Sequence, residues 1–153
     1  MNRIIPAIVS VCLFALVGCG DRNEFVDYVP VGESGWAYGD TIRLITQFDD
    51  QSASGELSVN VRHDTDYLFQ NLWLEVTYMN GRNVCRDTVN VVLADKFGNW
   101  QGDGFGARYQ QSAVVRPSVT MTDSSTVTIR HIMRVDTLRN VEQIGLTFNP
   151  SNK

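Results

Sequence analysis

Cys19 is the residue whose type and surroundings most clearly predict chemistry. It follows Leu16, Val17 and Gly18, and an aliphatic residue, two small or medium residues and then a cysteine form a lipobox. In a lipobox the cysteine thiol is the nucleophile that takes up a lipid, and the chain is cut directly before it. The sequence therefore predicts a lipoprotein that is cut between Gly18 and Cys19 and carries its lipid on Cys19.

The residues ahead of Cys19 are organised like a secretory signal peptide. Arg3 supplies a positive charge before an uncharged apolar run from Ile4 to Val17, and this run is shorter than the roughly 20 residues that span a bilayer. Residues 1–18 are therefore expected to be removed, and acyl chains such as palmitate on Cys19 would then hold the remaining chain to a membrane. The alternative is an ordinary signal peptide or a short anchor with a cysteine in this position by chance.

The chain that remains is acidic and long enough for one domain. It has 135 residues, with 12 basic against 17 acidic side chains once Arg3 is removed, which suffices for a real core. This charge argues against nucleic acid as a partner, because phosphate binding needs clusters of basic residues. Cys85 is then the only cysteine besides Cys19, so we expect no disulfide within the chain and interpret Cys85 as a small apolar residue.

A polar cluster over residues 62–67 contains the second candidate for chemistry. His63 stands beside Asp64 and close to Asp66, a set that would suit a metal site or an acid–base pair. A second histidine at ligand spacing is missing, however, and metal sites usually take three or four ligands. We therefore interpret the cluster as the end of a strand that runs into a charged loop.

A glycine-rich run over residues 96–106 is the third candidate. Phosphate-binding glycine loops lie between a strand and a helix, whereas this run lies among predicted strands. Calcium binding through Asp95 and Asp103 is an alternative, but the spacing of the acids does not match an EF-hand. We interpret the run as a bulged loop in which glycines adopt positive φ, with Trp100 and Phe105 capping the fold. No catalytic, metal-binding or cofactor-binding residue is predicted.

Strands are the elements that must position all of these residues. From Trp36 onward, apolar and polar residues alternate with a period of two, which places one face of each strand on a core. The inward positions are Ile42, Leu44 and Phe48; Leu57, Val59 and Val61; Leu72, Leu74, Val76 and Tyr78; Val89, Val91 and Leu93; Val127, Ile129, His131 and Met133; and Ile144, Leu146 and Phe148. Asn80-Gly81 between two such runs predicts a hairpin.

These patterns predict an all-β fold and three parts of the chain. About seven or eight short strands at this spacing favour an antiparallel two-sheet β-sandwich, with a jelly roll as one form of it. The signal peptide covers residues 1–18, and the lipidated N-terminus and tether cover residues 19–35, within which residues 25–29 could add a short strand. The β-sandwich domain is expected over residues 36–153.

Four segments of the domain resemble a known family. They are Trp36-x-Tyr38-x-Asp40-Thr41; Arg62-His63-x-x-Asp66-Tyr67-x-Phe69-x-Asn71-Leu72-Trp73-Leu74; Gly98-x-Trp100-x-Gly102-x-Gly104-x-Gly106; and Met133-Arg134-x-Asp136-x-Leu138-x-x-Val141-x-x-Ile144-Gly145-Leu146. Together with the lipobox they resemble, in order along the chain, the GldH gliding-motility lipoproteins of Bacteroidota. The sequence departs from the family at Leu68, where a proline is frequent, and at Asn140, where a glycine is frequent.

The resemblance implies an accessory lipoprotein of the gliding machinery, which is linked with the type IX secretion apparatus. It implies no enzymatic activity, and Cys19 is the only functional residue that it transfers. The expected partners are the membrane, through the lipid anchor, and other proteins of the gliding or secretion machinery. The expected location is the cell envelope, on the periplasmic face or the surface of the outer membrane.

Two other functions are carried as alternatives. A carbohydrate-binding outer-membrane lipoprotein would use aromatic side chains such as Trp36, Tyr38 and Trp73 to line a sugar groove. A hydrolase ranks last, because no nucleophile motif such as Gly-x-Ser-x-Gly is present.

Overall fold

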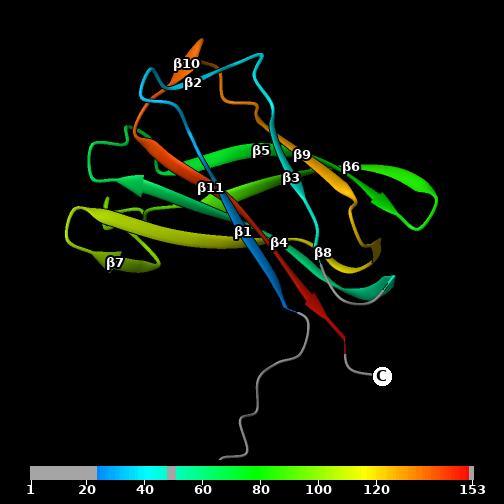
Figure 1. Ribbon diagram of the computed structural model, residues 1–153. Helices are drawn as coiled ribbons and strands as arrows, with labels where there is room; N and C mark the ends of the chain where they lie inside the picture. Colours follow the sequence, from blue (N-terminus) through cyan, green and yellow to red (C-terminus); the bar gives the residue numbers. More distant parts are fainter. Residues whose placement is uncertain (1–23, 48–50, 152–153) are drawn as a thin grey trace, which may run out of the picture.

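The chain is described by a computed structural model over residues 24–47 and 51–151, in which all regular elements are strands (Figure 1). The strands are β1 (Phe25–Pro30), β2 (Trp36–Ala37), β3 (Ile42–Ile45), β4 (Ser52–Asp64), β5 (Asn71–Asn80), β6 (Asn83–Val92), β7 (Asp103–Phe105), β8 (Arg108–Thr122), β9 (Thr126–His131), β10 (Thr137–Leu138) and β11 (Val141–Pro150). This part of the chain contains no helix that is long and apolar enough to cross a membrane.

The strands form two packed sheets and one small one, and all pairs are antiparallel. The large sheet has the order β1-β11-β4-β8-β7, and the facing sheet has the order β3-β9-β5-β6. A two-stranded sheet of β2 and β10 lies at one end of the sandwich (Figure 1). The predicted all-β antiparallel sandwich is thus confirmed, with the small third sheet as an addition.

The connectivity of the longer strands is nested. Eight strands have four residues or more, and among these the first pairs with the last, the second with the seventh, the third with the sixth and the fourth with the fifth. These pairs are β1–β11, β3–β9, β4–β8 and β5–β6, and successive pairs alternate between the two sheets. This arrangement of eight strands corresponds to the jelly-roll form of the sandwich.

The alternation in the sequence defines the core. The inward residues expected in β3, β4, β5, β6, β9 and β11 are buried, while Phe48 lies outside the described residues. The predicted hairpin is also confirmed, because β5 and β6 pair from Asn71 to Asn80 and leave Gly81 and Arg82 as a two-residue loop. Gly81 has a φ of +60°, as the first loop position of such a hairpin requires.

The N-terminal strand changes the expected limits of the domain. Residues 25–30 were assigned to the tether with a short strand, but β1 is an edge strand of the large sheet and pairs with β11 over all six of its residues. Phe25 is buried in the core, because burying its ring outweighs leaving this segment free. The large sheet therefore includes β1, which lies ahead of residue 36.

An ionic contact joins the two sheets along one edge of the sandwich, between β6 and β8. Arg116 on β8 donates to both carboxylate oxygens of Asp87 on β6, at 3.0 and 2.7 Å, and the hydroxyl of buried Tyr78 also donates to Asp87. β8 bulges where it passes Leu57 of β4, and such bulges redirect side chains. We call Arg116, Asp87 and Tyr78 the inter-sheet clamp.

Candidate functional site

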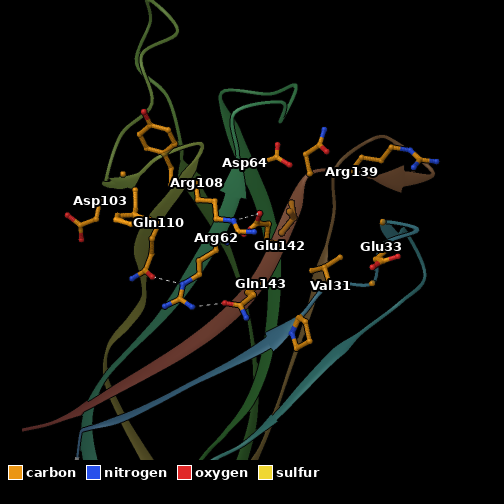
Figure 2. Close-up of a pocket in the computed structure, with 18 residues that line it drawn as sticks. Val31, Glu33, Arg62, Asp64, Asp103, Arg108, Gln110, Arg139, Glu142 and Gln143 are labelled. Carbon is orange, nitrogen blue, oxygen red and sulfur yellow. Dashed lines mark hydrogen bonds and ion pairs between the residues drawn. The ribbon is translucent and has the colours of Figure 1, made fainter.

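A groove of about 790 Å³ lies on the outer face of the large sheet, at the end where β4 stops (Figure 2). Its walls come from the end of β1 and the loop after it, from the β7–β8 hairpin, and from the start of β11. This volume falls within the range of about 300–1,000 Å³ that is typical of ligand sites. The charged side chains that line it are Glu33, Arg62, Asp64, Asp103, Arg108, Arg139 and Glu142.

Arg62 occupies the floor of the groove and is held from both sides. Its Nε donates to Oε1 of Gln110 at 2.7 Å, and its Nη1 donates to Oε1 of Gln143 at 2.6 Å (Figure 2). The guanidinium carbon lies 3.8 Å from the centre of the Tyr28 ring, within the range of a cation–π contact. The guanidinium is therefore fixed in position and orientation by neutral groups.

The register of the sheet explains this arrangement. Val61 and His63 point inward on β4, so Arg62 between them points outward. Gln110 on β8 and Gln143 on β11 are the cross-strand partners of Arg62 on its two sides, and directly opposed side chains lie within contact range. Three adjacent strands thus bring their polar side chains to one point.

A glycine makes room for the aromatic side of the site. Tyr28 pairs with Gly145 across β1 and β11, and a Cβ atom at position 145 would lie 2.5 Å from Cε1 of Tyr28. The ring of Tyr28 therefore lies directly over the backbone of β11, where it can support Arg62.

The polar floor continues along the sheet below Arg62. Asn60 donates to Oγ1 of Thr147 at 2.7 Å and accepts from the hydroxyl of Ser112 at 2.7 Å. A second hollow of about 420 Å³ lies over these residues and shares Gln110 with the groove. Polar side chains thus continue along the outer face of β4 from Arg62 to Asn60, with the exposed Val26 and Val114 beside them.

The acids at the loop end of the groove have structural partners of their own. Glu142 accepts from Nε of Arg108 at 2.8 Å, and Asp64 accepts from the backbone N–H of Asp66 at 2.8 Å. Such a carboxylate closing a turn is a frequent device where a strand ends. The interpretation of residues 62–67 as a strand end with a charged loop holds for Asp64 and Asp66.

His63 departs from that interpretation, because it is fully buried beneath the floor. Its ring packs on Trp100 at 4.6 Å, Tyr67 at 5.6 Å and Tyr109 at 6.0 Å between ring centres. Nδ1 donates to the carbonyl of Asp64 at 2.8 Å, whereas Nε2 has no hydrogen-bond partner among the described residues. Burial lowers the pKa of His63, since it disfavours the charged ring.

The second histidine has a separate environment. His131 is fully buried and packs edge-on against Trp36 and Tyr38, and its Nε2 donates to the carbonyl of Trp36 at 3.0 Å. Burial lowers the pKa of His131 as well. Within residues 24–47 and 51–151, no group of three His, Cys, Asp or Glu side chains is placed to hold a metal ion.

The glycine-rich run forms the bulged loop that was predicted. Gly98, Gly102 and Gly106 have positive φ, and Trp100 packs against the edge of the core. Phe105 is expected from the sequence to cap the sandwich, but its side chain is 88% exposed, because it ends the short edge strand β7 just before the turn into β8. Asp95 accepts from the backbone N–H groups of Phe97 and Asn99 and so closes a turn.

The aromatic residues proposed for a sugar groove are dispersed. Trp36 is buried, Tyr38 packs against His131, and Trp73 lies on the outer face of the smaller sheet. None of the three lines the groove. Cys85 is a free, partly buried thiol, and Cys19 lies outside the described residues.

Three loop tips beside the groove expose large apolar side chains. Leu68 is 83% exposed, Phe97 is 78% exposed and Phe105 is 88% exposed, which makes them the most exposed large apolar residues of the described chain. Their loops are neighbours, since Thr65 donates to the carbonyl of Ala107, and Ala94 donates to that of Gln70. We call Leu68, Phe97 and Phe105 the apolar tips.

Neither the Arg62 site nor the apolar tips were predicted from the sequence. Gln110 and Gln143 lie 48 and 81 residues from Arg62 along the chain, so only the register of the folded sheet unites them. For the tips, the sequence offers a signal at Phe97, a large apolar residue between Lys96 and Gly98.

Comparison with known proteins gives one family and one distant fold. The model of the family described as GldH lipoprotein matches residues 23–148. A protein of Christiangramia forsetii named "Gliding motility lipoprotein GldH homolog" is 26% identical over 145 residues, which cover 90% of this chain and 86% of that protein. A solved structure, Eiger TNF from S. frugiperda, aligns with 86% of this chain and 96% of its own at 10% identity and a TM-score of 0.38, a likeness that supports no argument.

Proposed function

The chain belongs to the GldH lipoprotein family, and on that premise we propose that it is an accessory component of the gliding-motility and type IX secretion-associated machinery that works through protein contacts. Anchored to the outer membrane through lipid on Cys19, it would present its sandwich domain to other proteins of the machinery. The role is one of binding and not of catalysis.

The observation that supports a contact role is the position of the apolar tips relative to the anchor. β1 begins opposite Phe148 and Leu57 and runs toward the groove, so Phe25 lies at the end of β1 that is away from the groove. Five residues separate Cys19 from Phe25, and six chain steps span at most about 20 Å. Exposed apolar side chains that gather away from an anchor are typical of a contact surface.

The composition of the groove supports binding over catalysis. None of its lining residues is Ser, Thr, Cys, His or Lys, which leaves Asp, Glu and Tyr as the side chains there that could act as nucleophile or proton carrier. Glu142 is paired with Arg108, and Asp64 closes a turn. The remaining groups suit recognition of charge.

Site-specific photo-crosslinking in cells tests the contact role. A photoreactive amino acid at position 68, 97 or 105 should give adducts with identified gliding or secretion proteins. Position 84 is the matched control, because Val84 is 71% exposed but lies on the β5–β6 hairpin at the other end of the sandwich. Equal adducts at position 84, together with intact gliding and secretion after deletion of the gene, would contradict the proposal.

The anchor has its own test. A Cys19→Ser variant should stay uncut, lose lipid labelling with a palmitate analogue and be absent from the outer-membrane fraction. A Cys85→Ser variant is the control and should fractionate like the parent protein. Unchanged lipid labelling of the Cys19→Ser variant would contradict lipidation at this residue.

The alternative, carbohydrate binding, rests on the polar floor of the groove. The amides of Gln110, Gln143 and Asn60 could bind sugar hydroxyls, yet the groove has no stacking platform formed by Trp36, Tyr38 or Trp73. A glycan panel that leaves the melting temperature unchanged would remove this alternative, and a rise with one glycan class would favour it.

A further inference from the structure

Arg62 and Arg139 are the two groove arginines without a carboxylate partner among the described residues, and Arg62 is the one of the two that neighbouring side chains hold in place. Arg108, Arg116 and Arg130 each bind a carboxylate at 2.7 to 2.8 Å. Within the described chain, Arg62 has side-chain hydrogen bonds only to two neutral amides. Its side chain is nevertheless partly buried on the floor of a groove.

The hydrogen bonds of Arg62 leave N–H groups on one edge of its guanidinium available to a ligand. A guanidinium has five N–H donors in a planar fork; one on Nε and one on Nη1 are used by Gln110 and Gln143. The two N–H groups of Nη2 and the second one of Nη1 remain. These can still form the two parallel hydrogen bonds that a carboxylate accepts.

The surroundings hold this fork without neutralising it. The glutamine oxygens and the Tyr28 ring fix the plane of the guanidinium, so little side-chain freedom is lost when a ligand arrives. Because Gln110, Gln143 and Tyr28 are uncharged, the guanidinium keeps its full positive charge and can attract an anion. Figure 2 shows Arg62 between Gln110 and Gln143, with Asp64, Asp103 and Glu33 arranged around the groove.

The acids around the groove restrict what the ligand is. Glu33, Asp64, Asp103 and Glu142 line the same cavity as Arg62, Arg108 and Arg139. The acids outnumber the arginines by one, and this balance disfavours a ligand with several negative charges. One carboxylate placed at Arg62 fits this pattern better than a polyanion. The adjoining hollow over Asn60 and Ser112 continues the polar face along β4, so the site has room for an extended ligand.

We propose that the groove binds a single carboxylate through Arg62, carried by an extended segment of a partner protein as an acidic side chain or a free C-terminus. This rests on the proposed contact function and names the chemistry that the partner presents. The segment would lie along the outer face of the large sheet, over Arg62 and the Asn60–Ser112–Thr147 network. Gln110 and Gln143 act as positioning residues that keep the fork of Arg62 directed at the ligand.

NMR titration of the full, lipidated protein in detergent micelles tests the site directly. The probes are the peptide acetyl-Ser-Gly-Glu-Gly-Ser-amide, the same peptide with Gln in place of Glu, the peptide acetyl-Ser-Gly-Gly with a free C-terminus, and inorganic phosphate. The Nε–H signal of Arg62, assigned by its absence in Arg62→Gln, should shift saturably with either carboxylate peptide. The glutamine peptide should bind at least tenfold more weakly.

Substitutions of Arg62 distinguish the contribution of its two parallel hydrogen bonds from that of its positive charge alone. Arg62→Gln should abolish the saturable shifts of neighbouring backbone signals, and Arg62→Lys should weaken binding about fivefold or more because it keeps the charge but loses the fork. Arg43→Gln is the control, since Arg43 is an exposed arginine on β3 of the other sheet, and it should bind like the parent protein. A melting temperature for each variant verifies that it is folded.

Several outcomes would overturn the proposal. They are equal binding of the glutamate and glutamine peptides, unchanged binding by folded Arg62→Gln, tighter binding of phosphate than of either carboxylate peptide, and no saturable shift with any probe. Comparing the affinities of the peptide with the free C-terminus and the glutamate peptide decides which source of the carboxylate is preferred. Because the titration uses purified protein, adducts at the apolar tips with a negative titration would reject this site and leave the contact function standing.

Discussion

The inter-sheet clamp and the Arg62 site contain similar parts and differ in one of them. Both hold an arginine near a tyrosine, Tyr78 in the clamp and Tyr28 in the groove. In the clamp the guanidinium binds the carboxylate of Asp87, whereas in the groove it binds the amides of Gln110 and Gln143. The comparison teaches that a paired charge stabilises the fold, while a charge held by amides stays available to a ligand.

The titration behaviour of the clamp agrees with a structural role. The hydrogen bond from Arg116 lowers the pKa of Asp87, so the carboxylate stays charged over the physiological range. Burial raises the pKa of Tyr78, which keeps its hydroxyl protonated and able to donate to Asp87. Asp87 therefore stays charged and Tyr78 stays protonated, which are the states in which the hydrogen bonds of the clamp form.

The largest effect is expected where the groove depends on backbone packing. A Cβ atom at Gly102 would lie 2.1 Å from the carbonyl oxygen of Gln110, and Gly102 has a φ of +85°. Gly102→Ala should therefore cost about 3 kcal/mol of unfolding free energy, through overpacking and an unfavourable φ. Denaturant unfolding measures this loss.

Gly98→Ala is the matched control for that change. Gly98 lies in the same loop with the same φ of +85° and has nothing within 4 Å of a built Cβ. Its replacement should cost only about 1 kcal/mol, from the backbone conformation alone. Equal losses for the two variants would show that the close approach at Gln110 does not stabilise the groove.

The second effect tests the clamp. Asp87→Ala removes the acceptor of Arg116 and of the buried Tyr78 hydroxyl, and should cost about 2 kcal/mol, as expected for charge-assisted hydrogen bonds in a partly exposed site. Urea unfolding of Asp87→Ala, Arg116→Met and the double variant would give the coupling energy. A coupling energy near zero between Asp87 and Arg116 would contradict the structural role that distinguishes Arg116 from Arg62.

The third effect is a loss of stability in mild acid. The folded pKa values of His63 and His131 are lowered from 6.5 by burial, so the unfolded chain binds more protons than the folded chain as the pH falls below about 6.5. The unfolding free energy should therefore drop by about 1 to 2 kcal/mol between pH 7 and pH 5.5. Urea unfolding at both pH values measures the drop.

The pH dependence also separates the histidines from the clamp. Asp87 has a folded pKa that is lowered from 3.8, so its contribution is complete above that value and is lost only as the pH falls below it. His63→Phe should flatten the profile between pH 7 and pH 5.5, while Asp87→Asn should leave the slope there unchanged. A slope that survives replacement of both histidines would refute their assignment as the acid-sensitive groups.

The smallest effect is expected at Arg62. Arg62→Gln should lower the unfolding free energy by about 1 kcal/mol, because it removes two hydrogen bonds to amides and a cation–π contact but no ion pair within the described chain. Denaturant unfolding beside Arg116→Gln measures the contrast. A loss at Arg62 as large as that at Arg116 would assign it a structural role.

Local patterns predicted much of the fold. The period of two identified the inward residues of six strands, and Asn80-Gly81 located the β5–β6 hairpin, because both signals depend on neighbours in the sequence. The sequence suggested β1 only as a short strand in a tether, since its place in the sheet depends on pairing with β11 at the far end of the chain. Apolar residues in a short polar segment do not reveal a partner more than 100 residues away.

The site was less predictable than the fold for the same physical reason. Arg62 and His63 are adjacent, yet one lies on the polar face and the other is buried among Tyr67, Trp100 and Tyr109. The polar cluster over residues 62–67 therefore contains a buried ring, that of His63, beside an oriented guanidinium, that of Arg62. The alternation along β4 distinguishes the two side chains, and the register of β4 with β8 and β11 supplies the partners of Arg62.

The pairing of β1 with β11 also sets how the domain responds to tension. A pull applied through the chain ahead of Phe25 acts along β1, parallel to the six paired residues from Phe25 to Pro30. In this geometry the hydrogen bonds between the two strands are sheared together, whereas a pull across the sheet would open them one at a time. If a moving partner draws on the far end of a lipid-anchored domain, resistance is governed by the rate at which β1 detaches, and the sandwich acts as a mechanical coupling.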